Sequence, residues 1–77
     1  MSVILYTLPS CGICKMIKTK LQAANIDYTE KDLTNYAEEL RTDHAPVLET
    51  IQETEHGTEI IRFFQPIDMI EWINLQG

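Results

Sequence analysis

The spacing of hydrophobic positions changes along the chain, and the changes divide it into strands and helices. Residues 3–7 are almost uniformly apolar, as in a central strand that is covered on both faces. From Ile13 the apolar positions recur at intervals of three and four, which is typical of one helix face. Asn25 suits the end of that helix, because Asn tolerates a left-handed conformation. The predicted apolar stripe consists of Ile13, Met16, Ile17, Leu21 and Ala24.

A second strand is predicted over residues 26–32, where apolar and polar residues alternate. Its polarity favours an edge position in the sheet. A strand, a helix and a strand within about thirty residues form a βαβ unit, so the first two strands should run parallel. Asp32 or Thr34 can then cap a short helix over residues 35–42. The buried stripe expected for this helix is Tyr36, Ala37 and Leu40.

Residues 47–52 and 59–64 are predicted to form an antiparallel hairpin, joined by a turn in which Gly57 can take a positive φ. Pro66 should open a last helix, because a missing N–H costs nothing in the first helical turn. The apolar face expected for this helix is Ile67, Ile70, Ile73 and Trp72. The predicted order is β-α-β-α-β-β-α, an α/β fold with four strands and three helices.

Length and charge narrow the classes of function. The 77 residues have room for a single domain, residues 1–77. The net charge of −6 argues against a nucleic-acid partner, because such affinity comes mainly from Lys and Arg. No segment approaches the roughly twenty apolar residues of a membrane span, and the N-terminus lacks the basic residues of a signal peptide. We therefore expect a monomeric cytoplasmic protein that binds neither nucleic acid nor a membrane.

Both cysteines lie in Cys11-Gly12-Ile13-Cys14, at the junction of the first strand and the first helix. The unpartnered N–H groups and partial positive charge of a helix N-terminus lower the pKa of a thiol from its usual value of about 8.5. We expect Cys11 to be the exposed nucleophile and Cys14, about one turn later, the buried resolving thiol. Lys15 adds a cation that favours the thiolate. Gly12 and Ile13 would offer close backbone approach and an apolar tip to a substrate.

Three alternatives stay open for the cysteine pair. The cysteines could be structural, although in a reducing compartment such a pair is more often catalytic or metal-binding. They could be half of a zinc site, but the other candidate ligands of that kind, His44 and His56, do not form a second close pair. They could hold an iron–sulfur cluster shared between two copies. The preferred hypothesis needs no metal and no cofactor.

The chain resembles the thioredoxin-fold redoxins, and within them the glutaredoxin branch, over essentially its whole length. The resemblance rests on the strand 3–7, the Cys11–Cys14 motif, the strand that ends at Asp32, and Ala45-Pro46-Val47. It implies a thioredoxin fold, with a four-stranded mixed sheet flanked by three helices, and thiol–disulfide oxidoreductase activity.

The resemblance also implies where a substrate would bind. It implies a cis peptide bond at Ala45–Pro46. The backbone of Ala45 would then pair with an extended substrate segment, which is strand addition at an exposed edge. The resemblance also implies that Tyr6 and Thr7, from the end of the first strand, approach the same site.

Two branches of this family differ in their electron source. Glutathione-using glutaredoxins usually have an aromatic residue inside the motif, a basic residue before it and a Gly-Gly pair after the fourth strand. This chain has Gly12-Ile13, no basic residue before Cys11, and Phe63-Phe64-Gln65-Pro66. Phe64-Gln65-Pro66 followed by Asp68 is more similar to the NrdH-redoxin type, although Phe63 stands where that group usually has Gly.

The NrdH-redoxin type donates electrons to ribonucleotide reductase and takes them from thioredoxin reductase. The resemblance therefore implies a reductase of protein disulfides with ribonucleotide reductase as the favoured partner. Thioredoxin reductase is the implied electron source, with glutathione as the alternative.

Overall fold

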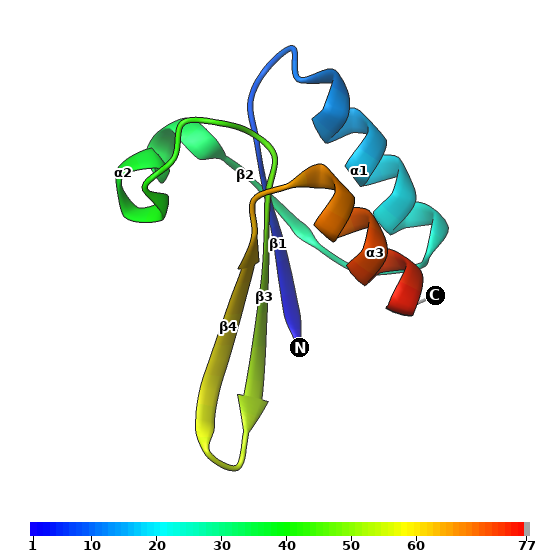
Figure 1. Cartoon of the computed structure of the whole chain (residues 1–77), viewed down its shortest axis with the longest axis vertical. Helices are drawn as coiled ribbons and strands as arrows, with labels where there is room; N and C mark the ends of the chain where they lie inside the picture. The colour runs from blue at the N-terminus through cyan, green and yellow to red at the C-terminus, as the bar shows by residue number, and fades with distance from the viewer. Residues whose placement is uncertain (77) are drawn as a thin grey trace.

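The computed structural model describes residues 1–76, and its elements follow the predicted β-α-β-α-β-β-α order with one added 3₁₀ turn (Figure 1). The strands are β1 (Ser2–Thr7), β2 (Thr29–Asp32), β3 (Val47–Thr54) and β4 (Gly57–Phe63). The helices are α1 (Gly12–Ala23), the 3₁₀ helix η1 (Leu33–Asn35), α2 (Ala37–Leu40) and α3 (Pro66–Gln76). No helix in this part of the chain is long and apolar enough to cross a membrane.

The four strands form one mixed sheet in the order β2-β1-β3-β4. β1 pairs in parallel with β2 and antiparallel with β3, while β3 and β4 form an antiparallel hairpin. β1 is central because its side chains are apolar on both faces, and polar β2 lies at an edge, as predicted. The tip of the β3–β4 hairpin projects away from the helices (Figure 1).

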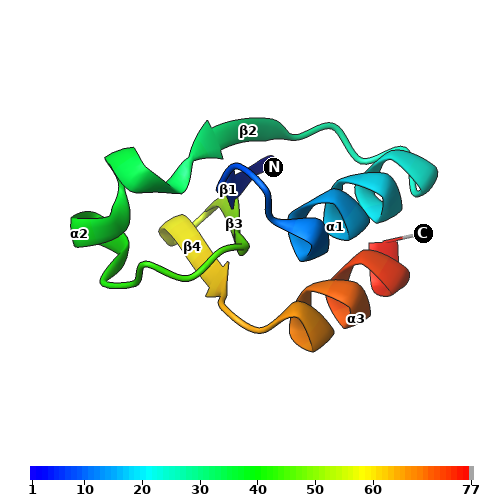
Figure 2. The same cartoon turned by 90° about the horizontal axis from the view of Figure 1, so that it is seen from above.

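Helices cover the two faces of the sheet unequally (Figure 2). α1 and α3 lie side by side on one face, and α2 lies on the other. Alternation along β1 sends Val3 and Leu5 toward α1 and α3, and Tyr6 toward α2. The larger core, under α1 and α3, contains Val3, Leu5, Ile17, Leu21, Leu48, Met69 and Ile73. The smaller core, under α2, contains Tyr6, Leu33, Leu40 and Val47.

Several local predictions hold, and each fixes one end of an element. Asn25 has a φ of 57° and follows α1, and Gly57 has a φ of 120° at the start of β4. Pro66 begins α3. The side chain of Asp32 accepts a hydrogen bond from the Thr34 amide at 2.8 Å, so it does cap the next helical segment.

The predicted second strand and second helix were both too long. β2 has only four residues, and the residues before Thr29 connect it to α1 outside the ladder. Asp32 caps the 3₁₀ helix η1 rather than an α-helix, and α2 follows as a single four-residue turn. Arg41, with a φ of 57°, takes the left-handed conformation that ends α2.

The apolar stripes of α1 and α3 were also partly wrong. Ile13 and Met16 are 48% and 38% exposed, because the face of α1 that turns inward carries Cys14, Ile17 and Leu21. In α3, Ile67 is 67% exposed. The residues that α3 buries are Met69 and Ile73, with Ile70 and Trp72 partly buried beside them.

Candidate active site

Cys11 occupies the N-cap position of α1. The loop that delivers it from β1 closes with a hydrogen bond from the Cys11 amide to the Leu8 carbonyl at 3.3 Å, and Ser10 has a φ of 66°. The side chain of Cys11 accepts a hydrogen bond from the Cys14 amide at 3.1 Å. A helix N-terminus therefore points one of its unpartnered N–H groups at the sulfur, where it would favour a thiolate in the reduced protein.

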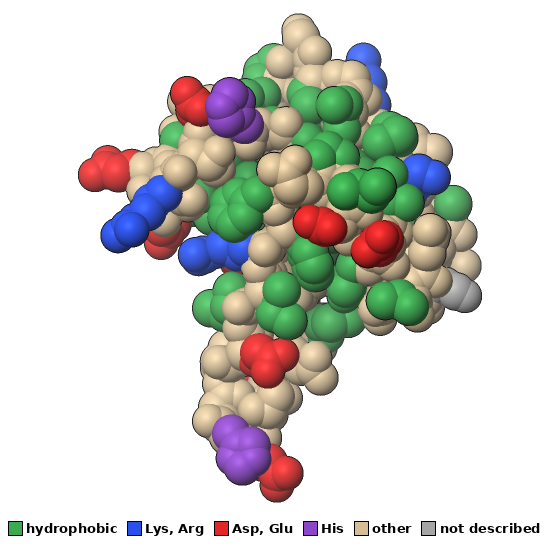
Figure 3. All heavy atoms as spheres, in the orientation of Figure 1, with side chains coloured by type: hydrophobic (Ala, Val, Ile, Leu, Met, Phe, Trp, Pro, Cys, Tyr) green, Lys and Arg blue, Asp and Glu red, His purple; other side chains and the backbone are tan. Residues whose placement is uncertain are grey.

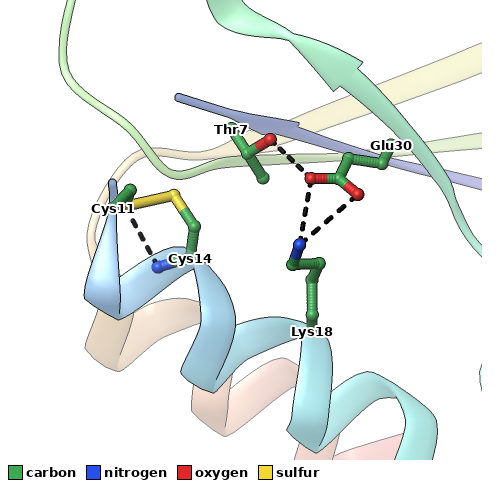
Figure 4. The surroundings of a disulfide bond; sticks show 5 residues. All are labelled: Thr7, Cys11, Cys14, Lys18 and Glu30. Atoms are coloured by element: carbon green, nitrogen blue, oxygen red, sulfur yellow. Dashed lines mark hydrogen bonds and ion pairs between the residues drawn. A yellow bond between two sulfur atoms is a disulfide. The ribbon is translucent and has the colours of Figure 1, made fainter. Parts of the chain in front are cut away.

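The two cysteines differ in their access to solvent. Their Cα atoms are 5.2 Å apart, and a disulfide joins them (Figure 4). Cys14 is 2% exposed and lies in the inward stripe of α1, whereas Cys11 is only partly buried. Cys11 is therefore the more accessible of the two sulfurs to an incoming sulfur.

A cleft of about 430 Å³ opens beside the disulfide, between the N-terminal half of α1 and the edge strand β2. The charged residues that line it are Lys15 and Lys18 from α1, and Glu30, Lys31 and Asp32 from β2. The ammonium of Lys31 is directed away from the cleft, over the ring of Tyr36 at 5.2 Å. Its remaining lining residues, from the end of β1 to the motif, are Thr7, Leu8, Pro9, Ser10, Cys11 and Cys14. Lys15 is thus placed near the cysteines as expected.

A hydrogen-bonded cluster in this cleft contains Thr7, which the family resemblance placed near the site, and two residues that sequence reasoning missed, Lys18 and Glu30. The carboxylate of Glu30 accepts hydrogen bonds from Thr7 Oγ1 at 2.7 Å and from Lys18 Nζ at 3.2 Å (Figure 4). The bond from Thr7, followed by the bond from Lys18, holds the pKa of Glu30 below its ordinary value of 4.5. The sequence held a signal for Lys18 alone, which stands four residues and about one helical turn after Cys14.

Tyr6 lies away from the cleft. It is 4% exposed and packs edge-on against Tyr36 in the smaller core, with ring centroids 5.2 Å apart. Burial, followed by the charge of Glu49, raises the pKa of Tyr6 above 10.0. The structure therefore does not bring the Tyr6 side chain together with the cysteines, because alternation along β1 directs it to the α2 face.

The remaining predicted site residues lie around the motif and in the loop before β3. A side chain at Gly12 would meet no atom within 4 Å, so this position faces open space. Ile13 is exposed, as an apolar tip that meets a substrate would be. The Ala45–Pro46 peptide bond is cis, with Ala45 partly buried and Pro46 buried.

Neither histidine lies at the cysteine cleft. His44 is 92% exposed in its side chain and contacts Asp43 at 3.4 Å, and His56 lies in the turn of the β3–β4 hairpin. Among residues 1–76, no three or more His, Cys, Asp or Glu side chains are grouped so that they could hold a metal ion.

The succession of strand, cysteine motif and helix is also found in a known protein family. The family model described as Glutaredoxin matches residues 3–47, which include β1, the Cys11–Cys14 motif, β2 and the cis-proline loop. The chain belongs to the glutaredoxin family. As a glutaredoxin-like domain it has a cysteine pair at disulfide distance, at the position where the family resemblance expected it.

Two curated relatives of this glutaredoxin-like domain are named as regulators. The global transcriptional regulator Spx of Lactiplantibacillus plantarum is 42% identical over 59 residues, which are 77% of this chain and 42% of that protein. The global transcriptional regulator Spx 1 of Oceanobacillus iheyensis is 35% identical over 72 residues, which are 87% of this chain and 52% of that protein. The chain spans about half the length of the curated relatives that it matches.

Solved structures share the fold at low sequence identity. TDR1 of Leishmania, a trimeric glutathione transferase, superposes with a TM-score of 0.77 at 13% identity, over 99% of this chain and 18% of that chain. Glutathione transferase Omega 2S of Trametes versicolor superposes with a TM-score of 0.71 at 15% identity, over 94% of this chain and 35% of that chain. The glutaredoxin-like domain therefore has the thioredoxin fold that is also found within these larger proteins.

Proposed function

We propose that the domain is a dithiol reductase of protein disulfides, with Cys11 as nucleophile and Cys14 as resolving thiol. The observation that carries the proposal is the hydrogen bond from the Cys14 amide to the Cys11 side chain at the start of α1. It supports a stabilised thiolate at the accessible sulfur, with a second, buried sulfur within bonding reach.

The reaction proceeds by two thiol–disulfide exchanges. The Cys11 thiolate attacks one sulfur of a substrate disulfide, forms a mixed disulfide and releases the other substrate sulfur as a thiolate, which takes up a proton. Cys14 then loses its proton to solvent and attacks the Cys11 sulfur. The bond between Cys11 and the substrate breaks, and its electron pair leaves with the second substrate sulfur. The substrate gains two electrons and two protons, and Cys11 and Cys14 become a disulfide.

A protein substrate is favoured by apolar side chains exposed beside the motif. Ile13 and Met16 near the start of α1, and Phe64 and Ile67 at the start of α3, are 48%, 38%, 46% and 67% exposed. The two helix starts lie side by side (Figures 1 and 2), and apolar side chains gather over this part of the molecule in the space-filling view (Figure 3). Exposed apolar clusters of this kind often mark protein contacts.

Recognition of the substrate backbone would come from the Ala45–Pro46 loop. The backbone at Ala45 would pair with an extended segment of the substrate. Gly12 supports this arrangement, because its open surroundings would let the two backbones approach closely.

Ribonucleotide reductase stays the proposed partner class, on the resemblance carried by Phe64-Gln65-Pro66 and Asp68. Reduction of protein disulfides by a dithiol takes place in a reducing compartment, and the cytoplasm is therefore the proposed location.

The electron source can be assigned by one assay with two arms. The reduced domain is regenerated either by thioredoxin reductase with NADPH or by glutathione with its reductase, and reduction of a protein disulfide is followed in each. We expect turnover in the thioredoxin reductase arm, and turnover only with glutathione would place the domain in the other branch. The absence of turnover in both arms, with Cys11 and Cys14 reduced at the start, would contradict the reductase proposal.

A second candidate, a redox-responsive regulatory domain, is favoured by the names of the two curated relatives. In that role the Cys11–Cys14 pair would act through its oxidation state rather than through turnover. The same assay separates the two functions. A regulatory domain would be oxidised and reduced once per molecule, without sustained transfer to a protein disulfide.

A further inference from the structure

The cluster of Thr7, Lys18 and Glu30 shares the active-site cleft with Cys14, yet the exchange reaction described above does not use it. Lys18 Nζ lies 3.2 Å from one carboxylate oxygen of Glu30 and 3.5 Å from the other. Thr7, which is 8% exposed, donates to the same carboxylate at 2.7 Å. The ammonium group is thus held by a partner that is itself anchored to the buried central strand.

Helix geometry brings Lys18 to the turn that carries Cys14. Residues four apart lie on one face of a helix, and long helical side chains lean toward the N-terminus, over the preceding turn. Lys18 stands four residues after Cys14, and Lys15 stands four residues after Cys11. In Figure 4 the Lys18 side chain rises from α1 toward Glu30, on the side of the helix that carries the disulfide. Each cysteine therefore has its own lysine one turn later.

The charges around Cys14 do not all act in one direction. Lys15 and Lys18 would favour a thiolate in the cleft, and Glu30 and Asp32 would oppose it. Lys31 also lines the cleft, but its ammonium lies 5.2 Å from the centroid of the Tyr36 ring, on the α2 face of the sheet. β1 and α3 contribute no charged residue to the cleft walls. Hydrogen bonds from Thr7 and Lys18 lower the pKa of Glu30, so its carboxylate is charged at neutral pH. Because Cys14 is 2% exposed, water cannot fully solvate its thiolate. Nearby charges therefore have a larger effect on the stability of this thiolate than they would at an exposed site.

We propose that the Lys18–Glu30 pair is a positioning pair for the resolving step, in which Lys18 favours the thiolate of Cys14 and Glu30 limits that effect. The inference rests on the proposed function and deepens it. The pair takes no part in bond formation. It sets how readily Cys14 loses its proton to solvent before it attacks the Cys11 sulfur and releases the substrate thiolate.

The test is a titration of the single remaining thiol in Cys11→Ser protein, followed by thiolate ultraviolet absorbance. Lys18→Met should raise the measured pKa of Cys14 by roughly half a unit to one unit, and Glu30→Gln should lower it by a similar amount. Lys20→Met is the matched control, because Lys20 is on α1 and does not line the cleft. It should leave the titration unchanged.

The decisive result is a shift of the Cys14 pKa in opposite directions in Lys18→Met and Glu30→Gln. A merely structural role would shift this pKa in the same direction in both variants, or in neither. Shifts in the same direction, or no shift in either variant, would overturn the proposal. If Lys18→Met fails to fold by circular dichroism, the sign of the Glu30→Gln shift decides alone. This titration needs no substrate, so its outcome is independent of whether the domain turns over a protein disulfide.

A kinetic measurement on protein with both cysteines checks the same inference. An aromatic disulfide whose released thiol absorbs visible light gives one signal when Cys11 attacks and a second when Cys14 resolves. Lys18→Met should slow the second phase by about two- to threefold at neutral pH and leave the first unchanged. Slowing of the first phase alone would assign Lys18 to Cys11 and overturn the proposal.

Discussion

The amide of Cys14 donates a hydrogen bond to the sulfur of Cys11 at 3.1 Å, so the resolving residue also supplies a donor to the nucleophile. The contact follows from the N-cap position of Cys11, because a capping side chain accepts from amides two or three residues into the helix. Lys15, which lines the same cleft, stands one turn beyond Cys11. The donor and the cation together should keep the Cys11 thiolate available at neutral pH.

Lys15→Met is therefore expected to slow alkylation of Cys11 by iodoacetamide about two- to threefold at pH 7, since one nearby cation is lost at an exposed site. The pH profile of the rate, measured in Cys14→Ser protein, should shift to higher pH. Lys20→Met is the control on the same helix and should leave the profile in place. An unchanged pH profile for Lys15→Met would mean that Lys15 has no effect on the Cys11 thiolate.

The ionisation of Tyr6 should make the free energy of unfolding depend on pH in the alkaline range. Burial, followed by the charge of Glu49, raises the pKa of Tyr6 in the folded protein above its ordinary value of 10.0. The folded protein then holds a proton that the unfolded chain releases, so the stability due to Tyr6 is fully present below pH 10 and declines as pH rises through the raised value.

Tyr6→Phe removes this contribution. The decline in the free energy of unfolding above pH 10, measured by urea titration at several pH values, should be shallower in Tyr6→Phe than in the unsubstituted protein. Equal slopes in the two proteins would mean that Tyr6 ionises alike in the folded and unfolded states.

The core under α1 should be sensitive to truncation at Ile17. Ile17 is fully buried among residues of β1, β3 and α3. Ile17→Ala should lower the free energy of unfolding by about 2–5 kcal/mol, through lost burial and the cavity that remains. Met16→Ala is the neighbouring control and should change stability by about 0.5 kcal/mol or less, because Met16 is 38% exposed. Equal losses in urea unfolding would contradict the assignment of the inward face.

The sequence predicted the order of elements because its strongest patterns are long. Three patterns were each compatible with one type of element. They are the apolar run of β1, the paired runs of β3 and β4 around Gly57, and Pro66 at the start of α3. The positions of the two cysteines, before and within the first turn of a helix, were predicted and are found in the structure. Their roles as nucleophile and resolving thiol stay a prediction.

Tertiary geometry decided what the sequence could not. Ile13 and Met16 fit a helical stripe as well as Cys14 does, so spacing alone could not tell which face of α1 turns inward. The contact between Lys18 and Glu30 joins residues 12 positions apart, on α1 and an edge strand. No local pattern reports such a pair. Tyr6 was expected at the active site, but its side chain lies on the opposite face of the sheet.

The different roles of Cys11 and Cys14 are the central claim, and trapping of a mixed disulfide tests them most directly. Reduced Cys14→Ser and Cys11→Ser proteins are each mixed with a protein disulfide, and the covalent adducts are quantified by mass spectrometry. Cys14→Ser should accumulate a stable adduct through Cys11, because no second sulfur releases the substrate, whereas Cys11→Ser should form almost none. Efficient adduct formation by Cys11→Ser through Cys14, with none by Cys14→Ser, would contradict the account.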